Sequence, residues 1–165
     1  MFREPALPFW SPVTLLATWF GSGLARKAPG TWGSLAALPF AALIHWLGGG
    51  WALLAASFVV FGLGLAVSGV YARAGDDPDP GAVVIDEVAG QWLTLAPLCL
   101  SWESYAFGFL LFRGFDISKL WPVSLVEARF GGAFGIMADD MVAGLYAGLI
   151  GYALFMWIGF ETCFP

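Results

Sequence analysis

Two pairs of adjacent acidic residues are the part of this sequence best suited to chemistry. Asp86 and Glu87, and again Asp139 and Asp140, stand beside long apolar stretches in a chain with only 12% charged residues. In each case a glycine follows at the fourth position after an aspartate, on the same face of a helix. Carboxylates are costly in apolar surroundings, so we interpret both pairs as parts of one functional site.

The donor atoms of these pairs favour a hard divalent cation. If both segments are helical, the glycines leave room above the carboxylates for a metal or a substrate. Oxygen donors indicate Mg²⁺ or Mn²⁺ rather than zinc or copper, and the single histidine, His45, lies in a distant segment. For Asp86 and Glu87, the simpler alternative is that one of the two acids only caps or complements a helix N-terminus.

Cations suited to phosphate stand in two other segments. Arg113, Asp116 and Lys119 follow one another at steps of three residues, roughly on one side of a helix. Arginine and lysine donate to phosphate oxygens, and Asp116 would orient them or ligate a cation. The alternative is a pair of bases that reach the membrane surface beside a neutralising acid.

The segment from Gly21 to Ser34 is rich in glycine and hydroxyl groups and contains Arg26 and Lys27. Glycines let backbone N–H groups approach an anion, and the N-terminus of a following helix favours negative charge. The spacing differs from a nucleotide-binding P-loop, because neither serine nor threonine follows Lys27. We predict a phosphate-binding loop with Lys27, Thr31 and Ser34, against the alternative of a tight turn at the membrane surface.

The elements that must hold these residues are membrane helices. The chain of 165 residues is 59% hydrophobic, has a mean hydropathy of +0.79 and carries about half the charge of an ordinary soluble domain. Its net charge of −5 and the lack of a basic stripe give no reason to expect nucleic acid as a partner.

We predict an all-α, polytopic helical bundle that forms a single domain over residues 1–165. Residues 1–34 would form an interfacial or re-entrant segment and the phosphate loop, and residues 35–160 the bundle. About five spans are expected, at roughly residues 35–47, 51–71, 83–100, 105–120 and 141–160, with a turn at Gly48–Gly50. The shorter spans would lean on their neighbours or thin the bilayer.

Counting basic residues predicts the orientation. With a cytoplasmic N-terminus and five crossings, all seven lysines and arginines fall on the cytoplasmic side. Both acidic pairs and Asp116 then fall on that side too, whereas Glu103 and Glu161 face outward. Segments far apart in the sequence would therefore converge at one membrane surface.

Four motifs in order resemble the phosphatidylglycerophosphatase A family: Ala28–Leu35 (APGTWGSL), Asp86–Gly90 (DEVAG), Arg113–Lys119 (RGFDISK) and Met137–Gly144 (MADDMVAG). The resemblance extends from about Gly21 to Gly148. It implies a multi-pass, Mg²⁺-dependent phosphatase of the bacterial inner membrane with an all-helical fold. Its substrate would be phosphatidylglycerophosphate, which it would hydrolyse to phosphatidylglycerol and phosphate, and its other partners would be membrane lipids.

The residues and the resemblance suggest the same roles. Asp86, Glu87, Asp139 and Asp140 would hold one or two Mg²⁺ ions, and Asp86, Asp139, Asp140 and Lys119 would form the catalytic set. Lys27, Thr31, Ser34, Arg113 and Asp116 would bind the substrate. Attack by water is preferred to an aspartyl-phosphate. The sequence does not indicate an oligomeric state.

Other functional classes explain less of the pattern. A small cation- or proton-coupled transporter would also contain intramembrane carboxylates and broken glycine-rich helices. However, the acids of this chain are expected at one surface and not at the membrane midplane. A lipid phosphotransferase would need a long aspartate signature that is absent, and a purely structural subunit would leave the acids unexplained.

Overall fold

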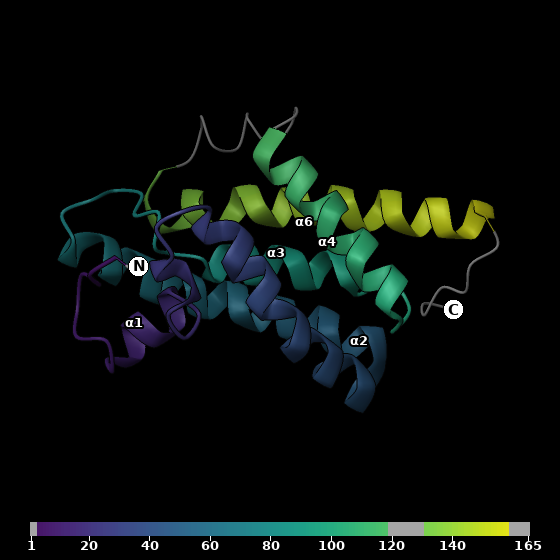
Figure 1. Cartoon of the computed structure of the whole chain (residues 1–165), viewed down its shortest axis with the longest axis horizontal. Helices are drawn as coiled ribbons and strands as arrows, with labels where there is room; N and C mark the ends of the chain where they lie inside the picture. Colours follow the sequence, from purple (N-terminus) through teal and green to yellow (C-terminus); the bar gives the residue numbers. More distant parts are fainter. Residues whose placement is uncertain (1–2, 119–130, 159–165) are drawn as a thin grey trace.

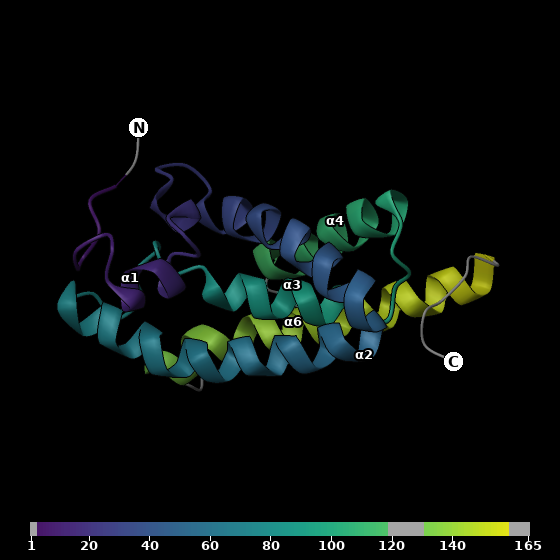
Figure 2. The same cartoon turned by 90° about the horizontal axis from the view of Figure 1, so that it is seen from below.

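The chain is described by a computed structural model over residues 3–118 and 131–158. The regular elements there are helices, which confirms the predicted fold class. In chain order they are α1 (Pro12–Ala17), the 3₁₀ turn η1 (Ser22–Leu24), α2 (Pro29–Ala74), α3 (Ile85–Leu95), α4 (Trp102–Ser118) and α6 (Gly132–Ile158). Figures 1 and 2 show α3 in the middle of the bundle, with α2, α4 and α6 around it.

Helix α2 consists of two arms that meet at Gly49. There the backbone adopts φ 69° and ψ −172°, a conformation that glycine tolerates and other residues resist. The chain reverses direction at this point, so the two arms form a helical hairpin (Figures 1 and 2). This confirms the turn predicted at Gly48–Gly50.

Two of the described helices, α2 and α6, are long and apolar enough to cross a membrane. Their outer faces expose large apolar side chains, among them Trp46, Phe58 and Leu149. So many exposed large apolar side chains are unfavourable in water, and they support contact with lipid. The fold is therefore that of a helical membrane protein, although the predicted count of five spans stays a prediction.

The third predicted span, residues 83–100, is corrected by the structure. Helix α3 ends at Leu95, shortly before Pro97, which cannot continue a helix. Its eleven residues extend over roughly 16 Å, about half the hydrocarbon thickness of a bilayer. Most of them are buried against other helices, which explains why their hydropathy resembles that of a lipid-facing span.

Helices α3 and α6 approach each other backbone to backbone. A Cβ added at Gly144 would collide with the backbone of Gly90, and one at Gly90 would collide with the carbonyl oxygen of Asp140. Thr94 reinforces the crossing, because its hydroxyl donates to the Gly144 carbonyl oxygen at 3.1 Å. The expectation that these glycines leave space for a ligand is wrong: the partner helix fills that space.

The N-terminal segment packs onto α2. Ser11 caps α1 by accepting a bond from the Thr14 amide at 3.1 Å, and α1 is too short to span a bilayer. Trp19 then contacts the rings of Phe40 and Trp92, with centroids 5.2 and 5.6 Å apart. Helix α2 begins at Pro29, so the predicted boundary at residue 35 falls inside a helix and the glycine-rich loop is shorter than expected.

Candidate active site at an acidic cavity

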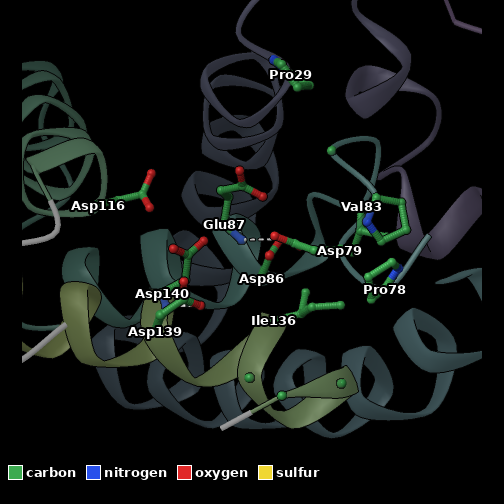
Figure 3. A pocket seen from close by; sticks show the side chains of 15 residues that line it. Pro29, Pro78, Asp79, Val83, Asp86, Glu87, Asp116, Ile136, Asp139 and Asp140 are labelled. Atoms are coloured by element: carbon green, nitrogen blue, oxygen red, sulfur yellow. Dashed lines mark hydrogen bonds between the residues drawn. The ribbon is translucent and has the colours of Figure 1, made fainter. Parts of the chain in front are cut away.

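A cavity of about 360 Å³ lies where α3 and α6 begin. Its wall comes from five places in the chain: the start of α2, the loop before α3, the first turn of α3, the end of α4 and the start of α6. The acidic residues among the lining are Asp79, Asp86, Glu87, Asp116, Asp139 and Asp140. Figure 3 shows their side chains directed into a common space.

Three carboxylates come together most closely. One oxygen from each of Asp86, Glu87 and Asp140 lies within 4.8 Å of the other two. Asp140 is only 4% exposed, and the other two side chains are half-buried. Helix α3 supplies one predicted pair and α6 contributes Asp140, so the Gly90–Gly144 crossing is what brings the two pairs to one place.

Each acidic pair has the same local geometry. The Asp86 carboxylate accepts from the Glu87 amide at 3.0 Å, and the Asp139 carboxylate accepts from the Asp140 amide at 3.0 Å (Figure 3). These bonds fix the first carboxylate of each pair against its own backbone. Asp139 lines the cavity but does not belong to the closest group of three.

The donor set fits a hard divalent cation. Carboxylates this close repel one another, and a shared cation removes the repulsion while giving each oxygen a partner. One oxygen of Glu87, Oε2, is buried without a hydrogen-bond partner, which suits a metal ligand. An all-oxygen set suits Mg²⁺ or Mn²⁺. This is a match of chemistry, and the predicted ligands remain predictions.

Arg113 is the cation closest to the acids among the described residues. Its Nη1 lies 2.5 Å from Oδ2 of Asp116 and 3.9 Å from Oε1 of Glu87, and its side chain is 12% exposed. The Nε atom is buried and has no hydrogen-bond partner. Arg113 is therefore oriented by two acids of the cavity and retains an unused donor.

Gly30 allows α2 to lie directly on this group. A Cβ at this position would collide with Oε1 of Glu87 and would lie 3.1 Å from Nη1 of Arg113. The first turn of α2 thus covers the Glu87–Arg113 pair with backbone alone, and Pro29 reaches the cavity wall.

The structure does not bring every predicted residue to the cavity. Lys27 lines a different cavity of about 730 Å³, and Thr31 lines neither. Ser34 is fully buried in the second turn of α2, where its hydroxyl has no partner. Lys119 lies outside the described residues. Of the predicted binding residues, only Asp116 lines the acidic cavity, and Arg113 adjoins it.

Two polar residues escaped the sequence analysis. Asp79 lines the cavity from the turn between α2 and α3, flanked by Pro78 and Pro80. The signal in the sequence is the acidic run DDPDP at residues 76–80, whose prolines indicate a turn. Gln91 is fully buried one turn after Glu87, and its amide oxygen and nitrogen have no partners. Nothing in the sequence marks Gln91, because its burial depends on how α3 packs.

A comparison with known protein families shows to which family the chain belongs. The family model described as phosphatidylglycerophosphatase A matches residues 15–155. The chain belongs to the phosphatidylglycerophosphatase A family. It is accordingly a lipid phosphatase, a hydrolase, as the four motifs indicated. Three of those motifs, from α2, α3 and α6, line the acidic cavity, and the fourth contributes Asp116 from α4.

Curated relatives support this membership of the phosphatidylglycerophosphatase A family. A protein of that name from Escherichia coli strain K12 is 43% identical over 148 residues, covering 86% of this chain and 83% of the relative. The Haemophilus influenzae protein of the same name is 37% identical over 149 residues, covering 90% and 91%. A Bacteroides thetaiotaomicron protein named as a putative phosphatidylinositol-3-phosphatase is 37% identical over 164 residues, covering 92% and 97%. No solved structure matches the chain.

Proposed function

We propose that this protein hydrolyses phosphatidylglycerophosphate to phosphatidylglycerol and phosphate, with Mg²⁺, at the cytoplasmic surface of the bacterial inner membrane. The observation that carries the proposal is the convergence of carboxylates from α3 and α6, within 4.8 Å, in a cavity that also contains Asp116. Two relatives that cover most of the chain carry the name of this activity.

The acidic group divides into ligands and supporting residues. Asp86, Glu87 and Asp140 would hold the first Mg²⁺, and Asp139 stands beside them for a second ion or for proton transfer. A bound Mg²⁺ would polarise the phosphoryl group and offset its charge. The same carboxylates repel the phosphate when no cation is present, so the protein's own charges make the activity depend on metal.

Arg113 would bind the phosphate oxygens. Its guanidinium faces Glu87 and is held by Asp116, so its position is fixed before substrate arrives. Charge spreads over the equatorial oxygens as the ester bond breaks, and a fixed cation stabilises that charge. Lys119 keeps its predicted role as a second cation for the same oxygens.

We favour direct attack by water on phosphorus. In that step the new P–O bond forms as the ester P–O bond breaks, and the ester oxygen leaves on the glycerol of the lipid. A carboxylate accepts the proton that water loses, and Asp139 is suited to this because it lines the cavity outside the closest group of three. The same carboxylate then returns the proton to the departing glycerol oxygen, which becomes a hydroxyl group of phosphatidylglycerol.

The location of the cavity suits a lipid substrate. The starts of α3 and α6, which line it, lie toward the end of the bundle that also holds α1, whereas the turn between the two arms of α2 lies toward the opposite end (Figures 1 and 2). A lipid phosphate sits at the depth of the headgroups while its acyl chains stay in hydrocarbon. A cavity at the ends of membrane helices therefore reaches the phosphate without extracting the lipid. The cytoplasmic placement follows from the predicted distribution of basic residues.

The test is phosphate release by the purified protein in detergent micelles, with Mg²⁺ and with EDTA. We expect release from phosphatidylglycerophosphate that needs Mg²⁺ and is lost in Asp139→Ala. Release that EDTA does not affect would refute the metal requirement. An Asp139→Ala variant with full activity would refute the role of that residue.

The Bacteroides relative supports a second candidate substrate, a phosphorylated inositol lipid. Phosphatidylinositol 3-phosphate also presents a phosphomonoester beyond a phosphodiester, so the same site chemistry applies. The same assay with this lipid separates the two candidates: a higher kcat/KM for the inositol lipid would replace the proposed substrate. The transporter alternative has no comparable support.

A further inference from the structure

A second cavity, of about 730 Å³, lies at the start of α2. Its lining combines the short segment before α2 with the outer face of the first turns of α2: Ser22, Ala25, Arg26, Lys27, Trp32, Leu35 and Ala36. Trp32 is 54% exposed and Leu35 44% exposed, so this side of α2 presents apolar surface outward. We call this cavity the basic groove.

The basic groove and the acidic cavity are immediate neighbours along the chain. Lys27 lines the groove, Pro29 lines the acidic cavity, and only Ala28 stands between them. Ala28 adopts a left-handed conformation, with φ 49° and ψ 53°, which is unfavourable for a residue with a side chain. This bend ends the loop and begins α2, and the segment Lys27–Pro29 leads from the lining of the groove to the lining of the acidic cavity.

The charges of the groove call for an anionic occupant. Arg26 and Lys27 are both exposed. Within residues 3–118 and 131–158, Arg113 is the cation that forms ion pairs with acids, and Arg26 and Lys27 have no acidic partner. Two unpaired cations beside an apolar floor match a phospholipid, with its phosphate at the cations and an acyl chain along Trp32 and Leu35.

We propose that the basic groove binds the phosphodiester and an acyl chain of the substrate while the acidic cavity binds its terminal phosphomonoester. The inference rests on the proposed function. The two phosphorus atoms of phosphatidylglycerophosphate are joined by six covalent bonds. Two Cα atoms that are two residues apart are also joined by six bonds, so the phosphorus atoms can lie roughly 7 Å apart at most. Lys27 and Pro29, one on each cavity, have that same separation in the chain. Arg26 and Lys27 are thus specificity-determining residues.

This arrangement distinguishes lipids by their number of phosphates. Phosphatidate carries a phosphomonoester directly on the diacylglycerol and lacks a phosphodiester, so it cannot fill both cavities with phosphate. The enzyme should therefore prefer phosphatidylglycerophosphate, and the preference should depend on the two cations of the groove.

The experiment compares kcat/KM for phosphatidylglycerophosphate and phosphatidate in the wild type and in the double variant Arg26→Gln, Lys27→Gln. In the double variant we expect kcat/KM for phosphatidylglycerophosphate to fall by at least about tenfold more than kcat/KM for phosphatidate. A loss of this size is typical when hydrogen bonds to charged groups are removed. The variant Arg73→Gln removes one exposed cation that lines neither cavity and serves as the control. The pair Arg26→Lys, Lys27→Arg keeps both charges and should restore most of the preference.

A binding measurement without turnover accompanies the assay. Short-chain phosphatidylglycerol, which has the phosphodiester but no phosphomonoester, is titrated in EDTA by calorimetry. We expect it to bind the wild type and the Arg73→Gln variant, and to bind the double glutamine variant at least about tenfold more weakly.

The outcomes separate the inference from the proposed function. Equal losses of kcat/KM on both substrates would overturn the inference. They would indicate that the groove binds a membrane lipid other than the substrate, or that the two cations attract the anionic membrane in general. Unchanged phosphatidylglycerol binding in the double variant would overturn it as well. If the wild type hydrolyses neither lipid, yet its phosphatidylglycerol binding depends on the pair, the proposed function fails and the groove remains a phosphodiester site.

Discussion

At the scale of single residues, the position of Glu87 depends on close contacts with its neighbours. Glu87 contacts Arg113 and lies against the backbone of Gly30, and its other carboxylate oxygen is buried without a partner. A carboxylate held in this way is prepared for a ligand that completes its bonding. The position of Glu87 therefore depends on the absence of a side chain at residue 30.

Gly30→Ala tests that dependence. The added methyl group would collide with Glu87 and crowd Arg113, so we expect at least about a tenfold loss of kcat and a loss of about 1–3 kcal/mol in stability. Gly62→Ala is the matched control, because a Cβ there meets nothing within 4 Å. The measurements are phosphate release and thermal unfolding in detergent. Normal kcat in Gly30→Ala would show that the contact does not position Glu87.

At the scale of helices, the crossing of α3 and α6 assembles the site. Asp86 and Asp140 belong to segments more than fifty residues apart, and they meet because Gly90 and Gly144 let the two backbones touch. Packing of small residues is a common way for helices to associate in lipid, where apolar side chains gain little by leaving the surrounding hydrocarbon.

Gly144→Ala should separate the two helices. Its Cβ would meet the carbonyl group and Cα of Gly90, which are backbone atoms that cannot rotate away. We expect a loss of about 1–3 kcal/mol in stability. We also expect that a higher Mg²⁺ concentration is needed for half-maximal phosphate release, because the distance between Asp86 and Asp140 grows. Gly114→Ala in α4 has open space around it and should behave as the wild type. If Gly144→Ala keeps the wild-type Mg²⁺ response, the crossing does not set the metal site.

The sequence predicted some of these elements and not others, for physical reasons. The acid pairs and the Gly48–Gly50 turn were predictable, because charge in apolar segments and runs of glycine are local signals. The length of α3 was not, since hydropathy does not distinguish burial in protein from burial in lipid. The role of Gly90 also depends on a partner helix, and the separation of Lys27 from the acids depends on the bend at Ala28.

At the scale of the whole molecule, polar groups gather toward one end. The acidic turn at residues 76–79 and the acidic cavity lie near the end that holds α1, while Glu103 lies at the start of α4 near the other end (Figure 1). Apolar surface covers much of α2 and α6 between them. This distribution matches a protein that presents its site at one membrane surface.

The predicted orientation is tested with single cysteines in cells. Asp77→Cys and Glu103→Cys change exposed residues toward opposite ends of the molecule. A membrane-impermeant maleimide applied from outside should label position 103 only, and position 77 should react after the inner membrane is opened, with the unaltered chain as background. Labelling of position 77 in closed cells would place the acidic cavity on the outer side.

The measurement that tests the central claim most directly is phosphate release from phosphatidylglycerophosphate as a function of Mg²⁺ concentration. It compares the wild type with Asp140→Asn, which alters a buried member of the closest carboxylate group, and with Asp76→Asn, an exposed acid outside the cavity. We expect saturable Mg²⁺ dependence in the wild type and in Asp76→Asn, and a loss of about a thousandfold in Asp140→Asn. Wild-type turnover and Mg²⁺ dependence in Asp140→Asn would contradict the assignment of the acidic cavity as the active site.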